Sequence, residues 1–231
     1  MPTIFDLLNQ FDFLRGLPAV YLVLLTAVII VVAWDWRLTL LALASQYLLA
    51  GLLFADVLDP RLLVVKLLNG LFICLILYIT ARQVNYGRLP ADLTPIEAAQ
   101  IEPEPRVQLG PLTIPTQAPL RLFLVMLLVL LIFTVGQRPF LQLPGIAETQ
   151  SHLNLAIFIL VGIGLLGMAI IRAPLLAGMS ALMFLTGFEL FYSLLEQSLA
   201  MLAVLVVVNL VAALTIAYLT QRYRAWSVLI E

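Results

Sequence analysis

The chain has 231 residues, of which 63% are hydrophobic and 11% charged, and its mean hydropathy is +1.11. A soluble domain cannot bury that share of apolar side chains, so the composition predicts an all-α, polytopic integral membrane protein in contact with lipid. The formal net charge of −1 excludes a broadly basic nucleic-acid surface, and the single cysteine, Cys74, excludes an intrachain disulfide and a cysteine-ligated metal cluster.

The N-terminal residues 3–15 place most of their apolar side chains on one side of a helix, with Thr3 available as a cap. This pattern is typical of a short helix lying in the membrane interface. The alternative is that these residues extend the first membrane span, from which Gly16 and Pro18 separate them.

Seven apolar segments follow, each near the length of about 20 residues that crosses the hydrocarbon core. They cover residues 18–34, 38–56, 61–81, 119–137, 152–171, 174–196 and 198–221. With seven spans, most arginines fall on one side of the membrane: Arg37, Arg82, Arg88, Arg106, Arg121, Arg172, Arg222 and Arg224, against Arg15, Arg61 and Arg138. The positive-inside rule then predicts an external N-terminus and a cytoplasmic C-terminus, in the inner (plasma) membrane of the cell.

One connection, residues 83–118, is long and rich in proline. Such density disfavours strand ladders, so we expect an extended cytoplasmic loop with at most a short helical turn at Thr94-Pro95. The loop divides the chain into residues 1–82, with the interfacial helix and three spans, and residues 119–231, with four spans. It is either a strap on a partner subunit or a tether between the two halves.

Glu189 is the only carboxylate deep inside a predicted span. An ionised carboxylate at that depth costs roughly 2.5–3.5 kcal/mol, so such residues usually handle protons, ions or a paired charge. The alternative is a neutral structural acid that is hydrogen-bonded to a neighbouring helix.

Further polar residues lie in the spans and should face other helices or a hydrated path, because lipid would leave them unpaired. Lys66, the only lysine, is either a proton-relay or charge-pairing partner or a side chain that snorkels to the outer interface. Asn69 lies one turn from Lys66 on the same helix face, and Gln46 and Asn209 lie inside their own spans. Asn209 is a candidate for the ion path or for a hydrogen bond between helices. His152, at the mouth of its span, suggests a structural role at the interface.

Small residues in the last spans predict close contact between helix backbones. They are Gly162, Gly164, Gly167, Gly178 and Gly187. Pro174 predicts a tight turn into the next helix. The chain contains no phosphate-binding loop and no nucleophile motif, so we expect no catalytic site, no cofactor and no metal site of its own.

The motif Leu185-Thr-Gly-Phe-Glu-Leu190, the three closely spaced helices of residues 160–224 and their basic end Gln221-Arg-Tyr-Arg224 resemble the K subunit of complex I and the C subunit of Mrp-type antiporters. The whole chain resembles the E component of hydrogenase-4 complexes, in Arg37, in Gln46 and in the run Tyr78-Ile-Thr-Ala-Arg82. That family has a lysine where Asn69 stands here, with Lys66 one turn earlier, and an acid near Asn209.

The resemblance implies a subunit in the membrane arm of a complex I-like or group 4 hydrogenase-like assembly that moves protons or sodium ions. Its partners would be other integral membrane subunits, including antiporter-like ones. Glu189, Lys66, Asn69, Asn209 and Gln46 would then line the ion path. The alternatives are a structural accessory subunit of another respiratory or photosynthetic complex, and an independent small transporter.

Overall fold

The computed structural model describes residues 12–84, 106–109, 112–115, 117–135, 143 and 151–229. Within these residues the chain forms seven α-helices: α2 (Leu17–Val32), α3 (Trp36–Phe54), α4 (Pro60–Gln83), α6 (Ala118–Val135), α7 (Ser151–Ile170), α8 (Pro174–Leu195) and α9 (Leu199–Leu229). A single 3₁₀ turn, η1 (Asp12–Leu14), precedes α2, and a small hairpin, β1 (Arg106–Leu109) and β2 (Leu112–Pro115), precedes α6.

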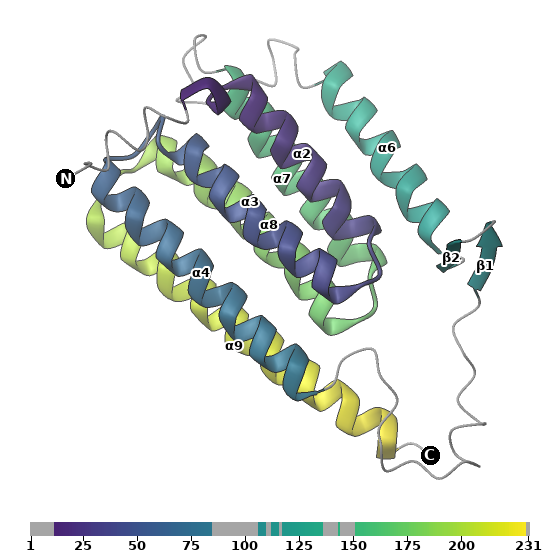
Figure 1. Cartoon of the computed structure of the whole chain (residues 1–231). Helices are drawn as coiled ribbons and strands as arrows, with labels where there is room; N and C mark the ends of the chain where they lie inside the picture. The colour runs from purple at the N-terminus through teal and green to yellow at the C-terminus, as the bar shows by residue number, and fades with distance from the viewer. Residues whose placement is uncertain are drawn as a thin grey trace.

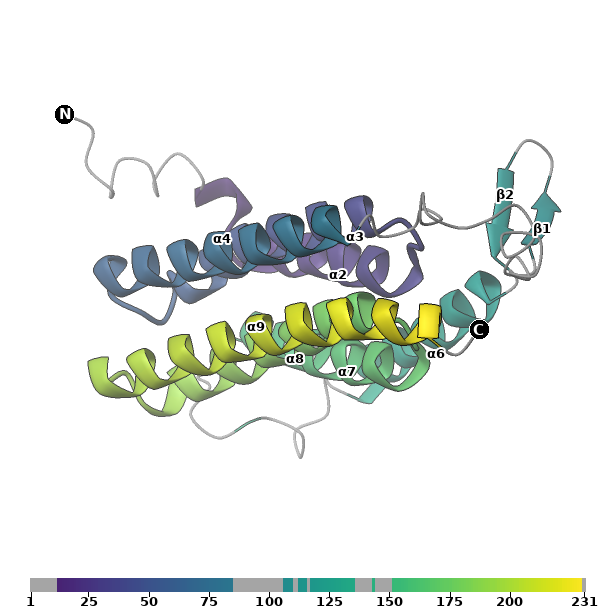
Figure 2. The same ribbon diagram turned by 90° about the horizontal axis from the view of Figure 1, so that it is seen from below.

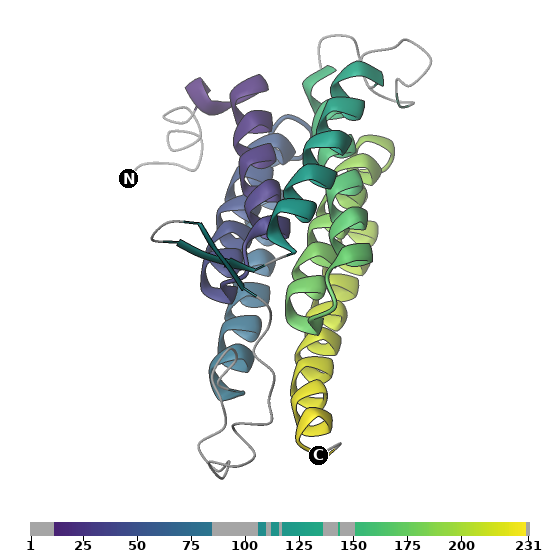
Figure 3. The ribbon, with the colours of Figure 1, turned by 90° about the vertical axis from the view of Figure 1, so that its right-hand side faces the viewer.

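Six of the helices form two stacked layers, α2, α3 and α4 over α7, α8 and α9 (Figures 1 and 2). Across the layers α2 lies on α7, α3 on α8 and α4 on α9, while α6 packs beside α2 and α7 (Figure 3). The first and last thirds of the chain therefore meet face to face along the length of the bundle.

Connections of three to five residues make neighbouring helices within each layer antiparallel. Asp35 and Asp59 cap α3 and α4 by accepting hydrogen bonds from the backbone N–H groups of Arg37 and Arg61. Pro174 opens α8, which confirms the predicted tight turn after α7. We call the end where α8 joins α9 the α8–α9 end, and the opposite one the α7–α8 end. α3 joins α4 at the α8–α9 end, and α2 joins α3 at the α7–α8 end.

The six longer helices are long and apolar enough to cross a membrane, which confirms six of the predicted spans. The bounds agree within two residues, except that α9 continues to Leu229. The remaining helix, α2, has only 16 residues, fewer than the roughly 20 that span a bilayer. Large apolar side chains cover the outer face of α6, as expected for a multi-pass membrane protein: Leu120, Phe123, Met126, Leu127, Leu130 and Leu131.

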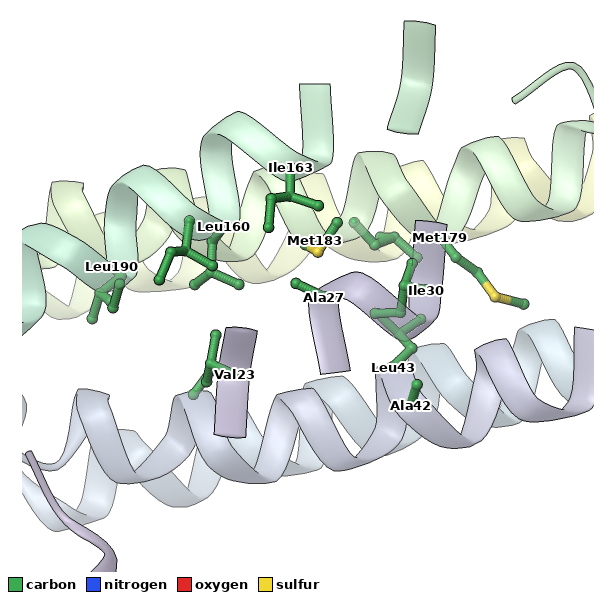
Figure 4. Packing of buried hydrophobic residues seen from close by; sticks show 14 of the residues in the cluster. Val23, Ala27, Ile30, Ala42, Leu43, Leu160, Ile163, Met179, Met183 and Leu190 are labelled. Carbon is green, nitrogen blue, oxygen red and sulfur yellow. The ribbon is translucent and has the colours of Figure 1, made fainter. Parts of the chain in front are cut away.

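Apolar side chains from both layers fill the space between them (Figure 4). Val23, Ala27 and Ile30 of α2 and Leu43 of α3 meet side chains of α7 and α8 there, among them Met183.

The predicted close approach at glycine is confirmed where α7 meets α8. A Cβ atom at Gly164 would lie 2.7 Å from the backbone nitrogen of Phe184, and one at Gly187 would lie 2.7 Å from Cβ of Leu160. A Cβ atom at Gly167 would lie less than 3.0 Å from the Ser180 hydroxyl oxygen. Between α8 and α9, a Cβ atom at Gly178 would lie less than 3.0 Å from the Ile216 side chain. Gly162 differs, because a Cβ there would make only ordinary contacts, with the ends of the Ile132 and Leu128 side chains at 3.4 and 3.6 Å.

The described part of the chain is all-α apart from one small hairpin, so the expectation that the proline-rich loop forms no strand ladder is wrong. Arg106 pairs with Pro115 and Leu109 with Leu112 in an antiparallel ladder. The ladder forms because its only proline, Pro115, is the last residue of β2, where a missing N–H is tolerated. The predicted interfacial helix of residues 3–15 lies outside the described residues except for its last turn, and the predicted turn at Thr94-Pro95 lies outside them altogether.

An ionic cluster around Asp56 ties three segments together at the α8–α9 end. Arg15, which precedes α2, approaches one oxygen of the Asp56 carboxylate with Nε at 3.1 Å and Nη2 at 2.5 Å. His152, in the first turn of α7, places Nε2 3.1 Å from the other oxygen. The contact agrees with the structural role that the sequence suggests for His152.

Replacing Gly164 with alanine should loosen the α7–α8 contact, because the backbone of Phe184 cannot turn away from the new methyl group. We expect a loss of about 1–3 kcal/mol, typical of an overpacked contact, seen as a lower melting temperature in detergent. Gly162→Ala is the matched control on the same helix and should leave the melting temperature unchanged. Equal effects of the two substitutions would contradict the tight α7–α8 packing.

Candidate functional site

Glu189 lies inside the bundle and does not face lipid. It belongs to the inward stripe of α8, with Leu182, Met183, Thr186 and Leu190, and only 3% of the residue is exposed. Its Oε1 accepts a hydrogen bond of 2.7 Å from Nδ2 of Asn209 on α9, which is 2% exposed. The two residues therefore lie at the same depth in the bundle.

The other carboxylate oxygen faces Lys66. Nζ of Lys66 lies 2.7 Å from Oε2 of Glu189, and only 5% and 4% of the two side chains are exposed. The ammonium also lies 4.9 Å from the centre of the Phe54 ring at the end of α3, within cation–π range. A carboxylate and an aromatic face thus replace the water that Lys66 loses on burial.

The two layers bring this site together. Lys66 lies on the buried stripe of α4, between Leu63 and Gly70. Because α4 packs on α9 and α3 packs on α8, the inward face of α4 meets the partners that α8 and α9 supply. The two ion-pair partners are 123 residues apart in the sequence, so the pair exists only when both layers are assembled.

Snorkelling of Lys66 to the interface, one of the two readings left open by the sequence, is wrong. Pro60 and Arg61 are close enough in the sequence for the amine to reach the helix end. The head group instead turns inward, and Nζ lies at contact distance from the carboxylate of Glu189 with only 5% of the lysine side chain exposed.

Asn69 and Gln46 are buried near the pair without joining it. Asn69 is 5% exposed and lies three residues beyond Lys66, roughly 4.5 Å farther along α4. Gln46 of α3 is 1% exposed. The adjacent Tyr47 packs its ring against Gly70, so both α3 residues lie at the depth of Asn69. Neither the Asn69 oxygen nor either polar atom of Gln46 finds a hydrogen-bond partner among the described residues.

The sequence did not reveal two contacts around these groups, the Phe54 ring against Lys66 and the Asp56 cluster. The sequence did contain a signal from which the ion pair could have been predicted. Lys66 is the only lysine and Glu189 the only acid deep within a span, so each had one candidate partner of opposite charge. No such signal marks Phe54, because one more aromatic residue in an apolar helix is unremarkable in the sequence.

The chemistry available at this site is proton transfer. A carboxylate can accept a proton and an ammonium can donate one, whereas the amide of Asn209 can only hydrogen-bond to the carboxylate. A proton that passes from Lys66 to Glu189 would leave two neutral groups in a medium of low dielectric constant. Within the described residues, no three His, Cys, Asp or Glu side chains come together as metal ligands.

No protein-family model, no curated protein and no solved structure matches this chain.

Exchanging the charges of the pair tests its geometry. Lys66→Glu would place two carboxylates together and Glu189→Lys two ammonium groups, so each change should cost about 3–5 kcal/mol, as the breaking of buried pairs does. The double variant Lys66→Glu/Glu189→Lys should recover most of that loss, measured as the melting temperature in detergent.

The control is Arg61→Glu, which makes a similar change of charge at an exposed position of α4 and should have little effect. A double variant no more stable than the single variants would contradict the direct contact.

Proposed function

We propose that this chain is a membrane-arm subunit of a redox-driven complex, related to complex I or to group 4 hydrogenases, that translocates protons or sodium ions. Glu189 would take up and release a proton beside Lys66, with Asn209 holding the carboxylate in place. The observation that carries the proposal is the buried Lys66–Glu189 contact of 2.7 Å. The chain itself would hold no redox centre and no catalytic site.

A buried ion pair contributes little net stability to a fold, so its presence here argues for a functional role. Desolvation of the two charges cancels much of their attraction, and apolar residues of similar size often serve a fold equally well. Ionisable residues at membrane depth are costly, and they commonly mark ion or proton paths. The resemblance of the Glu189 segment to the K-like family points in the same direction.

The proposal includes seven spans, with the N-terminus outside and the C-terminus in the cytoplasm. The arginines that flank the spans support this orientation, because Arg37, Arg82, Arg121, Arg172 and Arg222 all belong to the α7–α8 end of the bundle. α2 would serve as the short first span, since its inward face is buried among the other helices.

One observation favours a different role, that of a structural accessory subunit in another energy-converting complex. Asn209, the hydrogen-bond partner of Glu189, is an amide and cannot exchange a proton near neutral pH. In this alternative the pair would be a fixed link between α4, α8 and α9.

Glu189→Gln should separate the two roles. The amide retains an oxygen to accept the bond from Asn209 but cannot carry the proton. Loss of the paired charge costs stability, as in the charge-exchange variants, so pumping is normalised to the amount of assembled complex, and we expect it to fall about tenfold or more. The measurement is acidification of inverted membrane vesicles driven by the electron donor of the parent complex. Unchanged pumping would refute proton transfer by Glu189 and leave the accessory role.

The matched control for this experiment is Asp59→Asn. Asp59 is exposed at the start of α4, and asparagine also caps a helix, so both assembly and pumping should be retained.

Purification in mild detergent tests membership of a complex separately. Migration with large antiporter-like and redox subunits supports the proposal. A homogeneous particle of this chain alone would refute it and favour an independent small transporter.

A further inference from the structure

A small recess lies between the ion pair and the α8–α9 end. Its polar lining comes from Lys66, Ser193, Glu196, Gln197 and Ser198, and its volume is about 10 Å³. Glu196, Gln197 and Ser198 form the exposed connection between α8 and α9, so the mouth of the recess lies at the surface. Lys66, at its inner limit, is buried.

Lys66 has N–H donors that the ion pair does not use. An ammonium group carries three N–H bonds, and beyond the ion-pair contact the described residues offer Nζ no acceptor in hydrogen-bond geometry. A volume of about 10 Å³ is close to the minimum that holds one water molecule. A water there would have Lys66, Ser193 and Glu196 within the same recess as polar partners.

Other unsatisfied groups lie one turn beyond the pair. Both polar atoms of Gln46 and Oδ1 of Asn69 are buried and lack a hydrogen-bond partner among the described residues. Buried polar groups are seldom left unpaired, and internal water is the usual partner where protein supplies none. Elsewhere in the described part of the chain, the only comparable atom is Nε of Arg121, at the start of α6.

In the half of the bundle near the α7–α8 end, the buried hydroxyl groups do not require water as a hydrogen-bond partner. Its buried hydroxyls each donate to a carbonyl oxygen four residues earlier in their own helix: Thr39, Thr80, Ser180 and Thr220. Between them lie apolar side chains, including Ala42, Leu43, Met179 and Met183 in Figure 4 and the fully buried Ile73 and Leu77 of α4. This layer separates the ion pair from the α7–α8 end.

We propose that the recess is a water-binding site that connects Lys66 with the aqueous phase at the α8–α9 end, and that the apolar layer closes the opposite end. Protons would then enter or leave the Lys66–Glu189 pair from one side of the membrane, and passage to the other side would require a neighbouring subunit. The inference deepens the proposed function and rests on the same ion pair.

A matched pair of cysteines on α8 tests this access. In a Cys74→Ala background, Ser193→Cys lies at the recess and Ser180→Cys lies in the apolar half. Both serines are at least 96% buried, and both donate to their own helix. The probe is the silver ion, a thiol-reactive cation about as large as a water molecule, added to right-side-out or to inverted vesicles. The readout is the thiol that a fluorescent maleimide still labels after denaturation.

We expect silver to block Ser193→Cys at least about tenfold faster than Ser180→Cys, which reacts only when the structure opens locally. We also expect the block from one side of the membrane only. Met201→Cys, on the α9 wall of the recess, should behave as Ser193→Cys does and guards against misfolding of a single variant.

Equal rates at the two serine positions, or reaction of Ser193→Cys from both sides, would overturn one-sided access. The assay needs no electron donor and no pumping. Its failure is therefore distinct from failure of the Glu189→Gln experiment, which tests proton transfer whichever side supplies the water.

Discussion

The contact between Lys66 and Glu189 is the constraint on which the interior of this protein depends. An ammonium and a carboxylate taken out of water each lose several kcal/mol of solvation, and an excellent mutual geometry is needed to offset that loss. Here the geometry comes from four helices, with Asn209 bonded to one carboxylate oxygen, Lys66 at the other and the Phe54 ring against the ammonium. Neither partner could remain buried and charged if the layers separated.

The close packing of α7, α8 and α9 determines which face of α8 meets each neighbouring helix. Gly164 and Gly187 allow the backbone of α7 to approach that of α8, and Gly178 makes room for the Ile216 side chain of α9. Such close approach leaves the polar face of α8, with Glu189 and Ser193, directed at α4 and α9. Small residues and buried charge are thus two parts of one arrangement, because the charge is shielded from lipid only while the helices remain close.

The interior is also unequal along its length. Toward the α7–α8 end every buried hydroxyl discussed above is satisfied by its own helix, and apolar side chains occupy the remaining space. The ammonium of Lys66, and one turn farther into the bundle the oxygen of Asn69 and the amide of Gln46, have polar atoms without a hydrogen-bond partner among the described residues. Polar groups that require water partners thus lie on one side of the apolar layer, and the interior differs between the two ends of the bundle. Such an asymmetry is a requirement of any vectorial proton transfer.

The sequence by itself determined the membrane class, most helix bounds and the position of Glu189 within an apolar helix, because apolar length and an isolated charge are local properties that hydropathy reports directly. It also placed Lys66 and Asn69 on one face, since helical spacing fixes that relation. Only the tertiary structure decided that Lys66 turns inward to Glu189, that Gln46 stays outside the pair and that a hairpin interrupts the proline-rich loop. These outcomes depend on the stacking of α4 on α9 and α3 on α8, and residues more than a hundred positions apart carry no local signal of which faces will meet.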